Sequence, residues 1–178
     1  DALPISEFKT LVIASADWLE ALIHKQTCQE HSMDSLESFG YGKGYMLALD
    51  HWRELLRWLD WFRVEKGITV ILIAHSEVRR FDSPETDSFD RYQIKLHKLA
   101  AAILTEWADI VGFANWMIVT STTDIGFGNT RTRGHSNGQR VLHLEERPSH
   151  TAKSRFPIPA QIELDWTELT RNLNKTRP

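Results

Sequence analysis

Two continuous apolar runs constrain the fold of this chain more than any other feature. Residues 11–13 (Leu-Val-Ile) and 68–73 (Ile-Thr-Val-Ile-Leu-Ile) are rich in β-branched side chains and lack an alternation of polar and apolar residues. Runs of this kind are typical of strands that are covered on both faces, as in parallel sheets. Residues 110–119 predict a third strand, and the alternation over residues 140–145 is typical of an edge or half-exposed strand.

Segments with helical periodicity lie between these runs. The spacing of apolar residues predicts helices over residues 17–25, 45–64 and 91–108, and Gly67 provides a stop after the second. Loops are expected at residues 35–44, 76–90, 120–138 and 146–159, and the third, rich in Thr, Gly, Asn and Arg, is expected to be mobile. This order of strands and helices predicts an α/β fold with a mostly parallel sheet flanked by helices.

Composition excludes several classes of protein. The 178 residues are 42% hydrophobic and 25% charged, as in globular chains, and no apolar run approaches the roughly 20 residues of a membrane span. A single cysteine, Cys28, excludes an internal disulfide and fits a reducing compartment, so we expect a soluble cytoplasmic protein without a membrane partner. The net charge is −3, yet residues 126–178 carry nine Lys and Arg against five Asp and Glu. This basic segment fits either a phosphate-bearing partner or a solvated face.

Polar residues follow both of the first two strands. Ser15 and Asp17 follow the first run, and His75 follows the second. In open parallel sheets ligands bind beyond the carboxyl ends of the strands, so these residues are candidates for a ligand site. The first run has the shape of a Walker B strand, in which an acid holds the Mg²⁺ of a bound nucleotide, but Ala14 stands at the position of that acid.

Three other motifs also have plainer interpretations. The sequence Gly-Tyr-Gly-Lys-Gly at residues 40–44 does not have phosphate-loop spacing and favours a tight turn. His24, Cys28 and His31 could line one helical face, but they lack a fourth ligand, so we predict no metal site. Lys153 and Arg155 stand two positions apart, which on an extended segment lets both reach one phosphate; an exposed loop explains them equally well.

Seven segments taken together resemble a known family. They are residues 9–13, 39–45, 70–77, 90–97, 106–109, 145–148 and 152–155. In this order they resemble the phage-encoded RecA-like ATP-binding proteins of the AAA family that are linked to single-strand annealing and recombination. The resemblance implies a RecA-like P-loop NTPase core, ATP with Mg²⁺ bound between neighbouring subunits, and self-association into a ring or filament. It also implies single-stranded DNA and phage annealing or replication proteins as partners.

The resemblance implies a division of the chain. Residues 8–166 would be a partial RecA-like ATPase domain and residues 167–178 a C-terminal tail. Residues 1–7 would be non-native or linker residues, the first six of which read like an adapter-derived scar. The family's phosphate-loop unit and catalytic acid would lie upstream of residue 8, so we expect an N-terminally truncated domain.

The resemblance also implies roles for individual residues. Ser15 would lie beside the metal, and Asp17 could replace the missing acid only if the end of the strand shifts. His75 would sense the γ-phosphate. Lys153 and Arg155 would act as fingers on the nucleotide of the adjacent subunit, although Ser154 replaces the asparagine expected between them.

A nucleic-acid site is expected in the loop at residues 120–138. In RecA-like assemblies, loops at the end of the sheet face the axis along which single-stranded DNA lies. Arg131 and Arg133 would bind the phosphates, and Phe127 would stack on a base.

Two hypotheses of function remain open at the level of sequence. The chain is either an ATPase fragment of a recombination or replication protein, inactive alone because it lacks Walker A, or a catalytically inactive module that assembles with active partners. A phosphate-loop motif upstream would favour the first hypothesis, and Ala14 favours the second. A generic α/β protein without a nucleotide role is a third, less specific interpretation.

Overall fold

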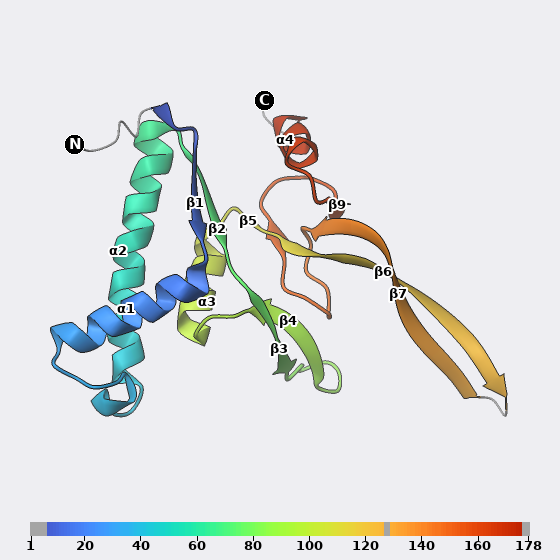
Figure 1. Cartoon of the computed structure of the whole chain (residues 1–178), viewed down its shortest axis with the longest axis horizontal. Helices are drawn as coiled ribbons and strands as arrows, with labels where there is room; N and C mark the ends of the chain where they lie inside the picture. Colours follow the sequence, from blue (N-terminus) through green and yellow to red (C-terminus); the bar gives the residue numbers. More distant parts are fainter. Residues whose placement is uncertain (1–6, 127–128, 176–178) are drawn as a thin grey trace. The chain divides into compact units, whose positions relative to one another are not determined.

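The chain forms two compact units. The computed structural model describes residues 7–126 and 129–175, with the side chains of residues 119–133 and 135 left out (Figure 1). The first unit comprises Asp1–Arg79 and Gln93–Trp107, and the second comprises Arg80–Tyr92 and Ala108–Pro178. No described helix is both long enough and apolar enough to cross a membrane.

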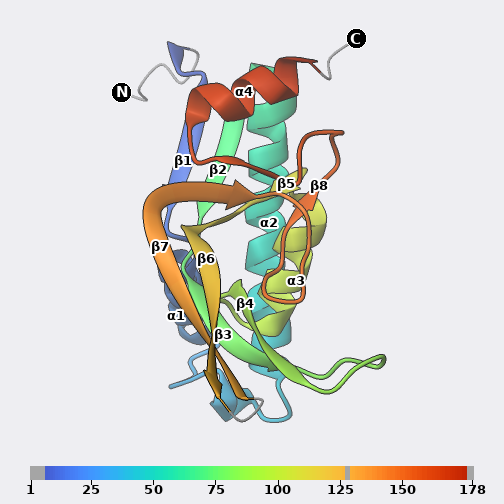
Figure 2. The same ribbon diagram turned by 90° about the vertical axis from the view of Figure 1, so that its right-hand side faces the viewer.

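The first unit is built on a pair of parallel strands. Its elements in chain order are β1 (Thr10–Ala14), α1 (Ala16–Glu30), the 3-10 turn η2 (Glu37–Phe39), α2 (Lys43–Lys66), β2 (Thr69–Ile73) and α3 (Lys98–Trp107). β1 and β2 lie side by side along α2 (Figures 1 and 2), with Thr10 opposite Thr69 and Ala14 opposite Ile73. This pairing confirms the prediction of two parallel strands separated by helices.

The helices cover one face of this strand pair. Leu11 and Ile13 of β1 pack against a core that includes Trp52, which is 1% exposed. The alternate residues Val12 and Ile73 are 49% and 50% exposed. The expectation that both faces would be covered is therefore wrong for the described structure, because alternate side chains of a strand point to opposite faces and the helices reach only one.

Helix α2 follows its sequence pattern closely. Its buried residues repeat at three-four spacing, and Gly67 ends it in the left-handed conformation, with φ of 61°. The predicted tight turn is confirmed at its start, where Gly42 has φ of 72°. Gly44 packs so closely on Leu36 that an added Cβ would lie 2.4 Å from the Leu36 carbonyl oxygen. The glycines of this segment thus serve the turn and the packing of the helix.

The second unit consists mainly of antiparallel strands. Its elements are β5 (Ile110–Val111), β6 (Phe113–Gly126), β7 (Asn129–His143), β8 (Lys153–Ser154), β9 (Gln161–Glu163) and α4 (Trp166–Lys175). The strands pair as β5–β8 and β6–β7–β9, all antiparallel. β3 (Ser76–Phe81) and β4 (Phe89–Ile94) form a two-stranded sheet, and the division between the units runs through both. The fold is α/β, but a mostly parallel sheet is not found among the described strands, where β1 and β2 are the parallel pair.

Three local predictions, one helix and two loops, are corrected by strand pairing. The helix expected over residues 91–108 begins only at Lys98, because the backbone of Tyr92 is paired with another segment of the chain. The Tyr92 N–H donates to the Ser149 carbonyl at 2.8 Å, and the Tyr92 carbonyl accepts from the Thr151 N–H at 3.2 Å. The expected loops at residues 76–90 and 120–138 contain β3 and most of the β6–β7 hairpin (Figure 2). In the hairpin, threonines favour strand conformation, and cross-strand pairing, which is interrupted by two register shifts, satisfies backbone groups. Residues 167–175, assigned to a tail, belong to α4.

A buried polar cluster holds the strands of the second unit together. Arg91 is 6% exposed, and its Nη2 donates to Glu146 Oε1 at 2.6 Å and to Thr151 Oγ1 at 2.7 Å. His150 is 4% exposed, stacks on Phe113 with a centroid distance of 4.9 Å, and has no hydrogen-bond partner at Nε2 in the described structure. Burial lowers the pKa of His150, and the neighbouring His143 and the cations of Arg91 and Arg147 lower it further.

We predict that His150 makes the second unit sensitive to acid. Because the pKa of His150 is lower in the folded than in the unfolded chain, the unfolded chain binds more protons, and stability falls as the pH drops below the ordinary histidine value of about 6.5. His150→Phe keeps the aromatic stack but takes up no proton. The fall in melting temperature between pH 8 and pH 5 should therefore be smaller in His150→Phe than in the parent.

His150→Gln serves as the control for this prediction. It also removes the titration, but it loses the stack on Phe113, so it should melt lower than His150→Phe at both pH values. An unchanged acid-induced fall in both variants would show that protonation of His150 does not limit stability.

Candidate functional site

The carboxyl ends of β1 and β2 bring three predicted residues to one edge. Ser15 follows β1, Asp17 lies in the first turn of α1, and His75 follows β2. His75 Nδ1 lies 2.9 Å from Asp17 Oδ2 and 3.0 Å from Oδ1, and the His75 backbone N–H donates to Oδ1 at 3.3 Å. Parallel pairing thus brings together two residues that are 58 positions apart in the sequence.

The Asp17 carboxylate is the electrostatic centre of this edge. Partial burial raises the pKa of Asp17, but the nearby Ser15 hydroxyl and the His75 donors outweigh that effect and hold the pKa well below the ordinary range. The carboxylate is therefore charged at neutral pH. Because a carboxylate can only accept hydrogen bonds, His75 Nδ1 carries the proton, which leaves Nε2 for another ligand.

Ser15 and Ala14 determine which metal ligands are present at this edge. Ser15 Oγ is shielded from solvent and lies near Asp17, but no described group meets it in hydrogen-bonding geometry. Ala14, the last residue of β1, has no side-chain oxygen. The edge therefore presents one hydroxyl and one carboxylate, and that carboxylate is already bound to His75.

A second polar cluster in the first unit was not predicted from the sequence. Glu20 accepts the His97 N–H through both carboxylate oxygens, each at 3.0 Å, and burial raises the pKa of Glu20. The Tyr45 ring stacks on His97 with a centroid distance of 4.1 Å, and the Tyr45 hydroxyl donates to Glu37 Oε1 at 2.5 Å. Glu20 lies one helical turn after Asp17, a spacing that could have marked it as a neighbour of the site.

The candidate metal triad is not assembled in the described structure. His24 lies edge-on to Tyr45, whereas His31 Nδ1 lies 3.0 Å from the Thr27 carbonyl, within its own helix and C-cap. Among the described residues, no group of three or more His, Cys, Asp or Glu side chains is placed to hold a metal ion.

Lys153 and Arg155 belong to the second unit. Lys153 pairs with Val111 across β5 and β8. Arg155 Nη1 binds Asp109 Oδ1 at 2.8 Å, and its backbone N–H donates to the Asp109 carbonyl at 3.0 Å. The Asp109 carboxylate thus binds the Arg155 guanidinium, and the Asp109 carbonyl binds the Arg155 backbone; the sequence did not reveal this partner.

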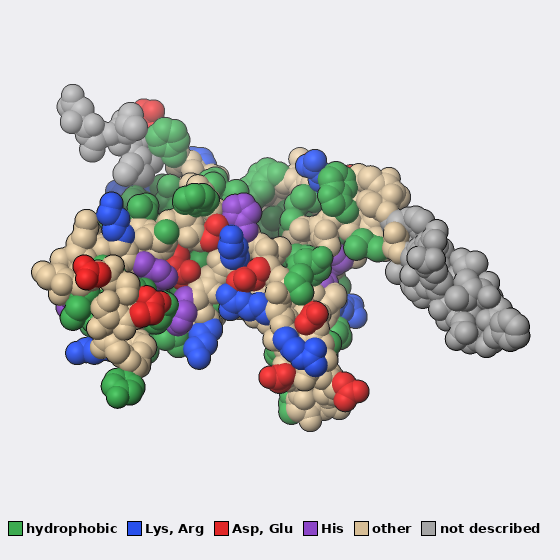
Figure 3. Space-filling model, turned by 60° about the horizontal axis from the view of Figure 1, so that its bottom comes forward, with side chains coloured by type: hydrophobic (Ala, Val, Ile, Leu, Met, Phe, Trp, Pro, Cys, Tyr) green, Lys and Arg blue, Asp and Glu red, His purple; other side chains and the backbone are tan. Residues whose placement is uncertain are grey.

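The predicted DNA-binding residues lie in the β6–β7 hairpin or beside it. Arg131 is opposite Thr123 and Arg133 is opposite Ser121 in the register of the hairpin, and the side chains of both lie outside the described ones. Phe127 lies outside the described residues altogether. On the face drawn in Figure 3, the described Lys and Arg side chains are interspersed with Asp and Glu.

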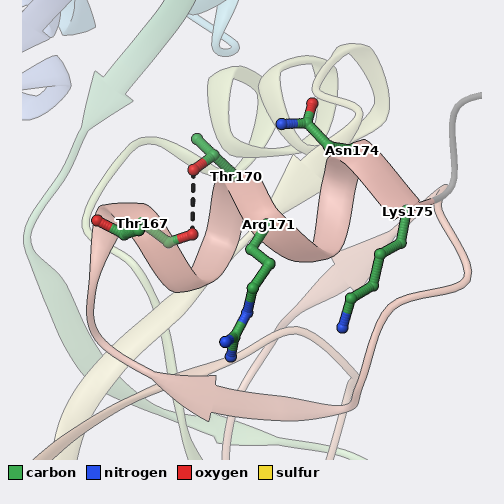
Figure 4. Close-up of a pocket in the computed structure, with 5 residues that line it drawn as sticks. All are labelled: Thr167, Thr170, Arg171, Asn174 and Lys175. Atoms are coloured by element: carbon green, nitrogen blue, oxygen red, sulfur yellow. Dashed lines mark hydrogen bonds between the residues drawn. The ribbon is translucent and has the colours of Figure 1, made fainter.

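A shallow pocket lies on the polar side of α4. Figure 4 shows its lining, which consists of Thr167, Thr170, Arg171, Asn174 and Lys175. Thr170 Oγ1 donates to the Thr167 carbonyl at 3.1 Å, and Arg171 forms an ion pair with Glu168. The pocket contains none of the predicted site residues, and all of its lining comes from one helix.

Comparison with known proteins gives the family of the chain. The sequence model of a family described as an AAA domain matches residues 4–156. A search of curated proteins and a search of solved structures returned no match. Proteins of the AAA family generally bind ATP with Mg²⁺, which indicates a nucleotide-binding, ATPase-like function. The match covers most of the chain, and the protein therefore belongs to the AAA domain family.

Proposed function

We propose that this chain is a RecA-like nucleotide-binding unit of a phage DNA recombination or replication protein, with its nucleotide site at the carboxyl edge of β1 and β2. The observation that carries the proposal is the convergence of Ser15, Asp17 and His75 at that edge in a chain of the AAA family. This edge is where ligands bind in open parallel sheets.

The residues at the edge have distinct roles in this proposal. Asp17 holds the His75 ring through Nδ1, so that Nε2 can contact the γ-phosphate of a bound nucleotide. The Ser15 hydroxyl, which lies near Asp17, would lie beside the metal of a bound nucleotide. Asp17 is thus a positioning residue for His75 rather than a substitute for the missing acid.

The described residues do not fit a complete ATP·Mg²⁺ site. Mg²⁺ neutralises charge on the phosphates during phosphoryl transfer, and it needs an oxygen where β1 ends in Ala14. The glycine-rich turn before α2 supplies no phosphate cradle, because the Gly40 N–H donates to the Glu37 carbonyl and the Lys43 N–H to the Gly40 carbonyl. We infer that this chain does not hydrolyse ATP alone, and that a phosphate loop outside the described residues would complete the site.

A second candidate function follows from Ala14. A RecA-like module that keeps the nucleotide edge but lacks the metal-binding acid could serve assembly, joining active copies in a ring or filament. In such an assembly Lys153 and Arg155 would face the nucleotide of an adjacent subunit, with Arg155 oriented by Asp109. The reducing host cytoplasm is the compartment that fits either function.

We predict that the chain alone binds ATP·Mg²⁺ weakly and at the proposed edge. Without a phosphate cradle, calorimetry should detect no affinity in the micromolar range. At millimolar ATP·Mg²⁺, NMR should show shifts confined to the amides of residues 14–17 and 75–77. Ala14→Asp should enlarge these shifts, because it restores a metal ligand, but should give no turnover.

Adenosine without phosphates is the control for these shifts and should produce none at the edge. Micromolar affinity, or turnover by Ala14→Asp, would show that the active site lies elsewhere. An absence of shifts in a chain that sediments as an oligomer would favour the assembly function over nucleotide binding.

Single-stranded DNA is the partner that we propose for the β6–β7 hairpin. Residues 115–140 contain three arginines and one acidic residue. Arg131 and Arg133 stand two positions apart on one strand of this hairpin, which suits contact with successive phosphates.

We predict that the double variant Arg131→Ala/Arg133→Ala binds single-stranded DNA more weakly than the parent. Loss of two phosphate contacts should lower the slope of log affinity against log salt by about 1.4, since each contact on a single strand contributes about 0.7. Fluorescence anisotropy of a labelled oligonucleotide at several salt concentrations measures both quantities.

The matched control is Lys153→Ala/Arg155→Ala, which removes the same charge from the same unit. We expect it to leave the DNA affinity and the salt slope unchanged. If the Arg131/Arg133 variant matches the parent in both quantities, the hairpin arginines have no role in DNA binding.

A further inference from the structure

An exposed aromatic residue lies at the base of the β6–β7 hairpin. Trp116 of β6 is 47% exposed, although tryptophan is usually among the more buried residues. The Arg140 guanidinium lies over its ring, with Cζ 4.8 Å from the ring centroid. The two residues are direct partners in the register of the hairpin, so the backbone itself holds this stacked pair together.

The exposed surface continues on both sides of this pair. Leu164, whose N–H donates to the Arg140 carbonyl at 3.1 Å, is 41% exposed, and Ile118 is 58% exposed. The pairing register shifts between Trp116 and Ile118, which interrupts the regular ladder at this point. Trp116, Arg140 and Leu164 lie side by side on neighbouring strands and are open to solvent within the second unit.

The chemistry of this surface suits an unpaired nucleobase. A base stacks on an aromatic ring, or on the guanidinium plane of an arginine that lies over the ring, whatever its sequence, and the N–H groups of that arginine can bind the adjoining phosphate. Arg140 has no carboxylate partner among the described residues, and residues 115–140 are net positive. A phosphate-bearing partner complements this charge, whereas a purely apolar protein surface would leave the arginine without a counter-charge.

We propose that Trp116 and Arg140 form a stacking platform that binds one unpaired base of single-stranded DNA. The proposal rests on the proposed partner of the hairpin and names residues that the partner contacts. Arg140 lies seven positions after Arg133 in β7, which is about 23 Å of extended strand. One DNA strand running along β7 would thus meet phosphate-binding arginines farther along the hairpin and the platform at its base.

The test compares Trp116→Ala with the parent on two strands of equal length, oligo(dT) and an abasic strand with the same phosphates. On oligo(dT), Trp116→Ala should weaken binding about 5- to 150-fold, the range for one lost base–aromatic stack. On the abasic strand the two proteins should bind alike, because no base is present to stack. The salt slope should not change, since no charge is removed.

Three further variants separate stacking from other effects. Trp116→Phe should retain most of the affinity, because it keeps an aromatic face. Arg140→Ala should weaken binding and lower the salt slope by about 0.7. Trp58→Ala removes a tryptophan on α2 that is 57% exposed, and it should leave DNA binding unchanged. Circular dichroism and the melting temperature verify that each variant is folded.

The outcomes distinguish this inference from the function on which it rests. If Trp116→Ala binds oligo(dT) as tightly as the parent while Arg131→Ala/Arg133→Ala loses affinity, the hairpin binds DNA and the platform is wrong. An equal loss on oligo(dT) and on the abasic strand would likewise overturn the stacking role. If the parent binds neither strand, the proposal that single-stranded DNA is the partner is wrong, and so is the proposal of the platform.

Discussion

The parallel pairing of β1 and β2 is the constraint on which the candidate nucleotide site depends. Because the two strands run in the same direction, their carboxyl ends meet at one edge, and Asp17 and His75 come within hydrogen-bonding distance. The packing of Leu11 and Ile13 on the helices fixes the register. A slip of one residue would turn the half-exposed Val12 into the core and separate Asp17 from His75.

Because Ala14 has no side-chain oxygen, it limits the ability of this edge to bind a metal ion. The Ser15 hydroxyl and the His75 donors keep the Asp17 carboxylate charged. Because the carboxylate binds His75 Nδ1, it orients the imidazole ring. A metal ion would have to compete with that pair and would gain little from the Ser15 hydroxyl alone. If the proposed nucleotide binds here, these residues would favour contact with its phosphates over its hydrolysis.

The second unit provides a different kind of surface. Its antiparallel strands are held by buried groups, with Arg91 joined to Glu146 and His150 stacked on Phe113, and these interactions support a hairpin that presents Trp116 and Arg140 to solvent. The exposed cation–aromatic pair would suit the proposed partner, which is recognised by stacking and charge. Binding of a nucleotide and binding of a nucleic acid would thus use separate units of one chain.

The sequence by itself determined the elements with strong local patterns: the β1 and β2 runs, helix α2 with its stop at Gly67, and the polar residues Ser15, Asp17 and His75 at the strand ends. It did not determine elements whose conformation depends on distant partners. The sequence pattern predicted a helix at residues 91–94, which form part of a strand, and a loop at residues 120–138, which form most of a hairpin. The sequence also did not indicate that Arg155 binds Asp109. Local periodicity reports only which face of an element is apolar. Strand pairing and salt bridges satisfy backbone and charged groups across the fold, so only the tertiary structure could decide them.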